Sequence, residues 1–388
     1  MTEIKRGFDT AEFEMRTSRA QEMMAEQKLD ALFFTTEANV RYFTGFLTQF
    51  WESPTRPWYL IVPAKGKPVA VIPEIGATGM AATWIDDIRT WASPNPEDDG
   101  ISLVADLLNS LPRRHGRIGA TLGLQSRLRM PVNDFKALSD KLSGAVFADV
   151  AGDIHRLRSV KSPAEVEKIR KACDITHHGF ANIPDHATAG QTEREICRRM
   201  RIDMLSAGAD AVKYLISGSG PDGYDSIIMG PTDRRLEMGD VLIIDTGAVF
   251  DGYFSDFDRN FAFGRASDLT LRAYDTVYRA TDAGFAAARP GATTTDIFNA
   301  MWAVMEAGGA LGNDVGRMGH GLGIQLTEWP SNTATDNTPL VPGMVITLEP
   351  GMTYAPGKSM VHEENLVITE EGAEYLSVRC APELPVLS

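Results

Sequence analysis

Apolar segments that border acidic residues are the feature that most constrains the fold of this 388-residue chain. The run 241–244 is followed by Asp245, the run 344–348 is followed by Glu349, and Glu363 precedes the run 366–368. Short apolar runs of this kind predict buried β-strands. A carboxylate at the end of a buried strand is costly unless it has a partner. The pattern therefore predicts strands whose ends hold acidic side chains around a shared cation.

Asp256 and His320 complete a set of candidate metal ligands in the C-terminal half of the chain. Asp256 follows Asp245 by eleven residues, after a turn at Asp251-Gly252, and His320 lies between two glycines. The alternative for each carboxylate is a helix cap, a turn residue or one half of a surface ion pair. The set as a whole favours a metal site, because carboxylate and imidazole groups are common ligands of divalent ions.

The composition favours a soluble protein. The formal net charge is −14 and no basic block offsets it, which argues against nucleic acid or an anionic membrane as a partner. No stretch of about 18 apolar residues occurs, so no membrane-spanning helix is expected. The cysteines, Cys173, Cys197 and Cys380, are odd in number and widely spaced, which is typical of a reducing compartment. We therefore expect a cytoplasmic protein without nucleic-acid or membrane partners.

The secondary-structure signals change character near residue 155 and predict two domains. Before that point, helical segments alternate with strand signals such as the hairpin pair 58–63 and 68–73. Ser162, Pro163 and Glu165 then form a capping-box pattern, which predicts the start of a new helix. We expect a smaller α/β domain over residues 1–155 and an α+β catalytic domain over residues 156–388.

These motifs resemble, in order and spacing, those of the creatinase, aminopeptidase P and prolidase family of "pita-bread" enzymes. The resemblance rests on Asp245–Ala248 with Asp256, and on Gly319–Gly323, Leu348–Gly351 and Glu363–Thr369. Residues 39–46 resemble the N-domain motif of the family, and residues 157–165 resemble its interdomain hinge. The fold implied is a C-terminal pita-bread domain preceded by a smaller creatinase-type α/β domain.

The resemblance also implies a role for each candidate ligand. Asp245 would chelate one metal ion, Asp256 and Glu363 would bridge two ions, and His320 and Glu349 would hold the second ion, with Glu349 also counted as catalytic. Bridging carboxylates offset the repulsion between two divalent ions, and a hydroxide held between the ions would be the nucleophile. Mn²⁺, Fe²⁺, Co²⁺ and Zn²⁺ all suit such ligands. In relatives, N-domain loops of one subunit close over the active site of its partner, so a homodimer is expected.

Departures from the family pattern concern the substrate rather than the metal. Proline-specific peptidases of the family have a second His seven residues after the ligand His, where this chain has Thr327. They also have a His before the first Asp, where this chain has Met229, and an Arg two residues before the last Glu, where it has Val361. Those histidines donate hydrogen bonds to the substrate carbonyl and the developing oxyanion. Met cannot donate one, and Thr donates only from a neutral hydroxyl.

Other residues are candidates for catalysis or substrate binding. Glu328 could serve as a replacement acid beside Thr327, or be a solvated charge. Arg317 could pair with a substrate carboxylate. His362 is adjacent to Glu363 and is expected to point to the opposite face of the sheet, which favours a structural role over a catalytic one.

The aromatic segment 50–59 is a candidate substrate lid. Trp51, Arg56 and Trp58 are the residues that would contact the substrate, and an aromatic box would favour a cationic solute. The alternative is a cluster in the core or in a dimer interface.

These observations leave several functions open. The first is a hydrolase that uses two metal ions to cleave a C–N bond of a small molecule or an unusual dipeptide, since creatinase and ectoine hydrolase show that the fold serves small nitrogenous solutes. The second is a metal-dependent lyase on a small carboxylated solute, like the dimethylsulfoniopropionate lyases of the family. A conventional Xaa-Pro dipeptidase or aminopeptidase and a non-catalytic relative are the others. The complete ligand set argues against a non-catalytic relative, and the hydrolase is the interpretation that we favour.

Overall fold

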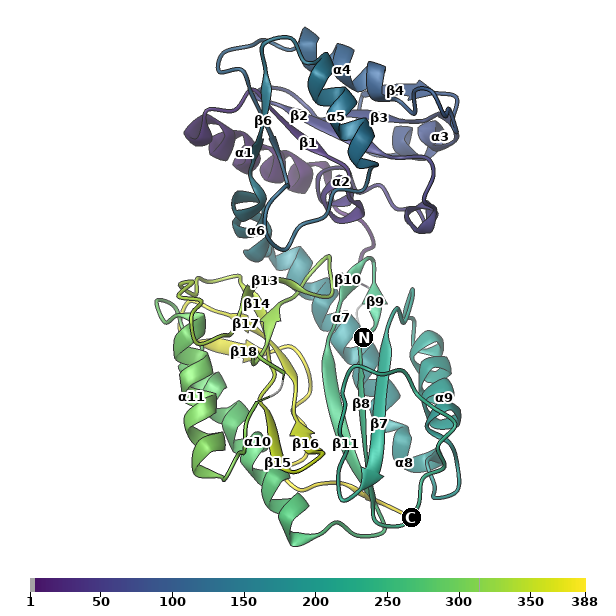
Figure 1. Ribbon diagram of the computed structural model, residues 1–388, viewed down its shortest axis with the longest axis vertical. Helices are drawn as coiled ribbons and strands as arrows, with labels where there is room; N and C mark the ends of the chain where they lie inside the picture. The colour runs from purple at the N-terminus through teal and green to yellow at the C-terminus, as the bar shows by residue number, and fades with distance from the viewer. Residues whose placement is uncertain (1–3, 314) are drawn as a thin grey trace. The chain divides into compact units, whose positions relative to one another are not determined.

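The computed structural model describes residues 4–313 and 315–388, which form two compact units. One unit is Lys5–Arg158, and the other contains Ser159–Ser388. Both units combine helices with β-sheet (Figure 1). This confirms the mixed helix and sheet architecture that the sequence predicts.

A six-stranded mixed sheet is the centre of the unit Lys5–Arg158, with strand order β4-β3-β2-β1-β5-β6. The hairpin expected over residues 58–73 is present, because β2 and β3 pair antiparallel. β1 pairs antiparallel with β2 and parallel with β5. The strands are β1 (Ala31–Phe34), β2 (Tyr59–Pro63), β3 (Val69–Pro73), β4 (Asp87–Trp91), β5 (Arg117–Ala120) and β6 (Val146–Asp149). The helices are α1 (Thr10–Gln27), α2 (Glu37–Thr44), α3 (Ala77–Ala81), α4 (Ile101–Ser110), α5 (Val132–Lys141) and α6 (Ala151–Ser159).

The core of this unit lies between the sheet and α4. Side chains alternate along a strand, so Ala31 and Phe33 of β1 share one face with Tyr59 and Ile61 of β2. Helix α4 presents its apolar stripe to the same cluster through Ile101, Val104, Ala105 and Leu108. The alternation of side chains along the strands and the apolar stripe of α4 together explain how the helix packs on the sheet.

Side-chain caps mark the N-termini of α7, α9, α10 and α11 in the unit Ser159–Ser388. Ser162 accepts a hydrogen bond from the Glu165 amide at 3.3 Å, and the Glu165 carboxylate accepts one from the Ser162 amide at 2.9 Å. This confirms the helix start that the sequence predicts at Ser162, and Thr192 and Glu195 form the same reciprocal pair at the start of α9. The helices are α7 (Pro163–Ala181), α8 (Ile183–His186), α9 (Glu193–Ser206), α10 (Asp268–Ala287) and α11 (Thr294–Ala307).

Two larger sheets form the body of this unit. The strand orders are β19-β11-β8-β7 and β13-β12-β14-β17-β18, and β9–β10 and β15–β16 are separate antiparallel pairs. The strands are β7 (Leu215–Pro221), β8 (Asp240–Thr246), β9 (Val249–Phe250), β10 (Tyr253–Phe254), β11 (Phe257–Phe263), β12 (His320–Gly321), β13 (Glu328–Ser331), β14 (Val345–Leu348), β15 (Gly351–Ala355), β16 (Lys358–Val361), β17 (Glu364–Ile368), β18 (Ala373–Tyr375) and β19 (Val386–Leu387).

The helices lie on the outside of these sheets. In Figure 1, α8 and α9 lie beside β7, whereas α10 and α11 lie on the side of β15 and β18. A buried cluster joins Val277 of α10 and Met301 of α11 to Ile346 and Leu366 of β14 and β17. Because the helices cover the outside, the ends of β8, β14 and β17 lie in the interior of the unit, where they converge.

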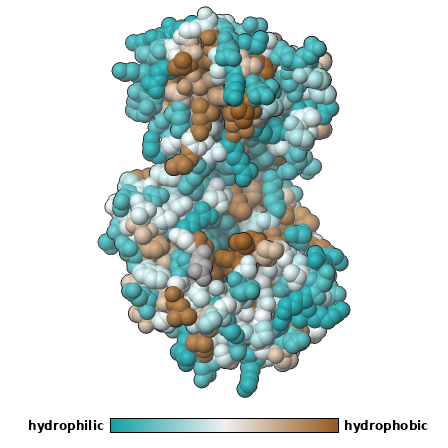
Figure 2. All heavy atoms as spheres, in the orientation of Figure 1, coloured by the Kyte–Doolittle hydropathy of each residue, from teal (hydrophilic) through white to brown (hydrophobic). Residues whose placement is uncertain are grey.

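Hydrophilic side chains cover most of the visible surface of each unit, with smaller hydrophobic groups between them (Figure 2). None of the helices in the described part of the chain has the length and apolar character needed to cross a membrane.

Candidate metal centre

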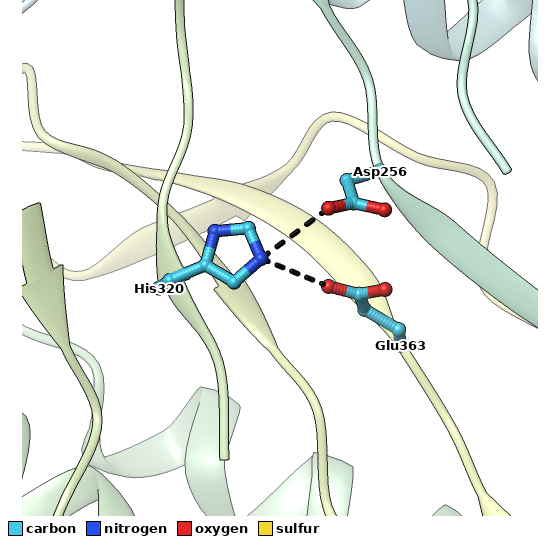
Figure 3. A group of neighbouring side chains, drawn as sticks. All are labelled: Asp256, His320 and Glu363. Atoms are coloured by element: carbon cyan, nitrogen blue, oxygen red, sulfur yellow. Dashed lines mark ion pairs between the residues drawn. The ribbon is translucent and has the colours of Figure 1, made fainter. Parts of the chain in front are cut away.

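Asp256, His320 and Glu363 converge in the interior of the unit Ser159–Ser388. One ligand atom from each lies within 4.8 Å of the other two, and all three residues are buried. The Nε2 atom of His320 lies 3.3 Å from Oδ2 of Asp256 and 3.9 Å from Oε1 of Glu363. Figure 3 shows the imidazole nitrogen facing both carboxylates. Three residues proposed as ligands thus meet at one point.

The backbone just before His320 can lie close to Thr347 only because residue 319 is a glycine. Gly319 has φ of +116°, and a Cβ atom there would lie 2.1 Å from the carbonyl oxygen of Thr347. The His320 amide donates to Oγ1 of Thr347 at 3.1 Å, and Nδ1 lies 2.8 Å from the carbonyl of Gly321. With Nδ1 donating to that carbonyl, Nε2 presents its lone pair to the carboxylates.

Asp256 is held from both its main chain and its side chain. Its amide donates to Oδ1 of Asn365 at 3.0 Å, and the Asn365 amide group donates back to the Asp256 carbonyl. The hydroxyl of Tyr214 donates to the Asp256 carboxylate. Gly247, directly after β8, allows the chain to pass close to the residue before Asp256, because a Cβ atom there would lie only 1.6 Å from the carbonyl oxygen of Ser255.

Asp245 and Glu349 lie at the ends of β8 and β14, outside the group of three. Burial raises the pKa of Asp245 well above its ordinary value, and the negative charge of Asp256 raises it further. Burial raises the pKa of Glu349 to about 8, and the charges of Asp245 and Asp256 add to the shift, whereas His320 opposes it. The two carboxylates are therefore close enough to the group of three to be coupled to it electrostatically.

The pKa shifts of Asp256, Glu363 and His320 all disfavour the charged form of the side chain. Burial raises the pKa of Asp256 to about 7, although the hydrogen bond from Tyr214 opposes this shift. Burial and the charges of Asp256 and Glu349 raise the pKa of Glu363 well above its ordinary value. Burial lowers the pKa of His320, and the positive charge of Arg317 adds to the effect. A neutral imidazole is the form that binds a metal ion.

The residues present fit a divalent metal ion. Within the described chain, Oδ1 of Asp245 and Oε1 of Glu363 are buried and have no hydrogen-bond partner. Buried carboxylates without partners are costly, and a cation would satisfy them together. The donor set of carboxylates and one imidazole suits first-row divalent ions.

Two residues at this site are absent from the sequence-based ligand set. Tyr214 precedes β7 and contacts Asp256, but no motif distinguishes it in the sequence. Asp258 lies two residues after Asp256 and is directly paired with Asp245 across β11 and β8. The two-residue spacing of Asp256 and Asp258 is a signal that could have found Asp258, because side chains at i and i+2 share one face of a strand.

Among the substrate candidates, Arg317 lies close to the ligand group. Its positive charge opposes the rise that burial causes in the pKa of Asp256 and of Glu349. Its guanidinium also makes a long contact, 3.5 Å, with the hydroxyl of Thr327. Thr327 is exposed, and Met229 is 59% exposed. Arg317 and Thr327 are thus brought together, and the Met229 side chain reaches solvent.

The side chains of Glu328 and His362 make contacts with residues outside the group of three. Glu328 is buried and forms a 3.0 Å ion pair with Lys161, so it is not a solvated charge, and its role as a replacement acid stays a prediction. The His362 ring packs edge-on against Tyr274, with 4.5 Å between ring centroids, and Nδ1 lies 3.5 Å from Sγ of Cys380. The structure therefore does not bring His362 to the Asp256 group, because consecutive residues of an extended chain point in opposite directions.

The aromatic lid candidates lie in the unit Lys5–Arg158. Trp51 and Trp58 are buried, with 6.0 Å between their ring centroids, and Cζ of Arg129 lies 5.1 Å from the Trp51 ring. Arg56 is partly exposed, with Cζ 5.9 Å from the centre of the Phe50 ring. The two tryptophans pack into their own unit, as the core-cluster alternative predicts, and a lid function stays a prediction.

Comparison with known families covers nearly the whole chain. Residues 167–371 match Metallopeptidase family M24, and residues 16–160 match the Creatinase/Prolidase N-terminal domain. Both agree with the resemblance carried by the sequence motifs.

Individual relatives agree with these matches. The chain is 32% identical to a probable dipeptidase, PepE, of Mycobacterium tuberculosis, with 98% of each chain covered. It is 29% identical to a Xaa-Pro dipeptidase of Pyrococcus furiosus, covering 93% of this chain and 97% of the other. The crystal structure of dipeptidase PepE from Mycobacterium ulcerans has a TM-score of 0.85 at 30% identity, covering 98% of this chain and 99% of that one.

Proposed function

The chain belongs to metallopeptidase family M24 and is an enzyme, and from that premise we propose that it hydrolyses the C–N bond of a dipeptide or of a dipeptide-like molecule with a free carboxylate. The observation that carries the proposal is the convergence of Asp256, His320 and Glu363 within 4.8 Å in the buried interior. The names of the dipeptidase relatives support a substrate of this size.

Divalent metal ions are part of this proposal. Asp256, His320 and Glu363 would hold them together with Asp245 and Glu349. Bound ions would polarise the carbonyl of the scissile amide and generate a hydroxide nucleophile near neutral pH. We propose two ions, because the carboxylates number four and their combined charge balances two divalent cations.

The protein's own residues supply orientation. Tyr214 donates a hydrogen bond to the Asp256 carboxylate and fixes its rotamer. The Gly321 carbonyl orients the imidazole of His320 through Nδ1. Both contacts hold the donor atoms in place before any substrate binds, which reduces the reorganisation needed during the reaction.

The position of Arg317 is the reason for proposing a substrate with a free carboxylate. Its charge acts on Asp256 and Glu349, so it lies beside the reacting centre, and its side chain is partly exposed and open to a ligand. A guanidinium group binds a carboxylate through two parallel hydrogen bonds. Arg317 would thereby place the C-terminal carboxylate of a dipeptide at a fixed distance from the metal ions.

The missing histidines shape the expected substrate range. The hydroxyl of Thr327 can donate only a neutral hydrogen bond to the developing oxyanion, and the thioether of Met229 donates none. We therefore propose that Xaa-Pro dipeptides are turned over more slowly than the preferred substrate. The free carboxylate, rather than proline, would be the group that the site requires.

A substrate panel tests the proposal. Protein loaded with Mn²⁺, or separately with Zn²⁺, is incubated with Xaa-Pro dipeptides, other dipeptides and the C-terminal amides of the same peptides, and the products are identified by mass spectrometry. We expect hydrolysis of the free acids and a loss of about 10- to 100-fold for the amides, the range for a hydrogen bond to a charged group. Arg317→Met should abolish that difference, whereas Arg279→Met, at an exposed position of α10, should preserve it.

Four results would contradict the proposal or a part of it. Hydrolysis of amides and acids at equal rates would remove the role of Arg317. Absence of dipeptide hydrolysis by loaded protein would remove the dipeptidase assignment, and an unsaturated product from a carboxylated solute would point to the lyase. Fast turnover of Xaa-Pro peptides would show that Thr327 suffices in place of the family histidine.

A further inference from the structure

Asp258 is a buried carboxylate for which the expected ligand set has no role. It is 2% exposed, and within the described residues its Oδ1 atom has no hydrogen-bond partner. A buried aspartate can find its partner within the protein chain. Asp240 of β8, for example, is also 2% exposed but forms a 2.6 Å ion pair with Arg234. An unmatched buried carboxylate indicates a partner that the protein chain itself does not provide.

The strand register places Asp258 at the metal centre. Asp258 of β11 is paired directly with Asp245 of β8 in the antiparallel ladder. Side chains of directly opposed residues lie on the same face of a sheet, with Cβ atoms about 4.5–5.5 Å apart. Asp258 therefore shares a face with Asp245, and Asp256 lies two residues earlier in the chain, directly before β11.

The neighbours of Asp258 on β11 confirm which face this is. Arg259 points to the other side, where its guanidinium lies 5.8 Å from the Phe180 ring of α7 and 3.0 Å from the Glu364 carboxylate. Phe257 points to that side too, with 5.5 Å between its ring and that of Phe180. The alternation leaves Asp258 directed to the interior, where the ligand carboxylates converge.

We propose that the Asp258 carboxylate is an additional anionic group of the metal centre, acting beside Asp245 on the ion that Asp245 holds. The inference rests on the proposed metal centre. It adds a fifth carboxylate to four that already balance two divalent ions. The surplus negative charge strengthens the binding of the metal, and it makes the metal-free protein less stable than a chain with a neutral residue at this position.

The test measures metal binding rather than turnover. Protein stripped with a chelator is titrated with Mn²⁺ by calorimetry, and the bound ions are counted by electron paramagnetic resonance, for the wild type, Asp258→Asn and Asp240→Asn. Asp258→Thr, which keeps a β-branched side chain suited to a strand, is a second variant in case Asn perturbs the fold. Asp240 is a matched control, since it lies on β8 about 16 Å along the strand from Asp245.

We expect Asp258→Asn to bind one Mn²⁺ at least about ten-fold more weakly than the wild type, the scale of a lost supporting group. The metal-free variant should have a higher melting temperature than the metal-free wild type. Asp240→Asn should show the reverse, with unchanged Mn²⁺ affinity and a lower melting temperature. Folded Asp258 variants with the wild-type affinity for Mn²⁺, or with a lower melting temperature in the metal-free state, would overturn the inference. A wild type that binds no Mn²⁺ and no Zn²⁺ would instead overturn the proposed metal centre itself.

Discussion

The Nε2 atom of His320 lies 3.3 Å from Oδ2 of Asp256, although the two residues belong to different parts of the fold. His320 begins β12 in the five-stranded sheet, and Asp256 directly precedes β11 in the four-stranded sheet. A metal ion held by both would connect the two sheets. Ligand binding to the folded state alone stabilises it, so metal content and stability of this unit should be linked.

Removal of the imidazole should show this link. His320→Ala is expected to weaken metal binding by more than about ten-fold, because the only imidazole of the group is lost. Added Mn²⁺ should raise the melting temperature of the wild type more than that of the variant. Calorimetric titration and thermal unfolding measure the two effects. His178→Ala, at an exposed position of α7, is the control, and an equal loss of affinity in both variants would argue against a ligand role for His320.

Glu349 should make the metal-free protein less stable as the pH rises. Its pKa is raised to about 8 in the folded state from an ordinary value of 4.5, so the folded state binds the proton more tightly than the unfolded state does. The associated stability is complete below about pH 4.5 and is lost as the pH rises through about 8. Asp256, with a pKa raised to about 7, acts in the same direction.

The measurement compares the wild type with Glu349→Gln, which cannot ionise. The free energy of unfolding of the metal-free variant minus that of the wild type should grow between pH 6.5 and 8. This window avoids the buried histidines, whose lowered pKa values act with the opposite sign below about pH 6.5. Glu371→Gln, at an exposed glutamate, controls for the loss of one charge. A difference that does not change with pH would contradict the raised pKa of Glu349.

Lys161 should stabilise the unit through its buried ion pair with Glu328. The Nζ and Oε2 atoms are 3.0 Å apart, and the two side chains are 1% and 5% exposed. Lys161→Met should lower the free energy of unfolding by about 3–5 kcal/mol, because it leaves a buried carboxylate without its lysine. Urea denaturation measures the change, and the double variant Lys161→Met/Glu328→Gln should recover part of it.

An exposed ion pair provides the comparison for Lys161. Arg279 and Asp275 form a 2.9 Å pair on α10, with side chains 55% and 60% exposed. Arg279→Met should cost less than about 1 kcal/mol, because water screens the charges. If Lys161→Met costs no more than this, the pair with Glu328 contributes little to stability.

Local patterns in the sequence determined much of the architecture. The capping box at Ser162 and Glu165 marks the start of α7, because a cap satisfies backbone groups within a few residues. The same holds for the hairpin of β2 and β3, whose strands and turn are neighbours in sequence. The strand-end positions of Asp245 and Glu349 follow from apolar runs that stop at an acidic residue. The family membership follows from the order and spacing of these motifs.

The tertiary structure alone decided which side chains meet. Asp258 faces Asp245 only because β11 and β8 pair in one register, and a shift by a single residue would turn Asp258 to the other face. The contact of Tyr214 with Asp256 and the pairing of Lys161 with Glu328 join residues that are distant in sequence. Such contacts depend on long-range packing, which no local pattern encodes. The candidate ligands could therefore be identified from the sequence, but the fold determines the charges and hydrogen bonds around them.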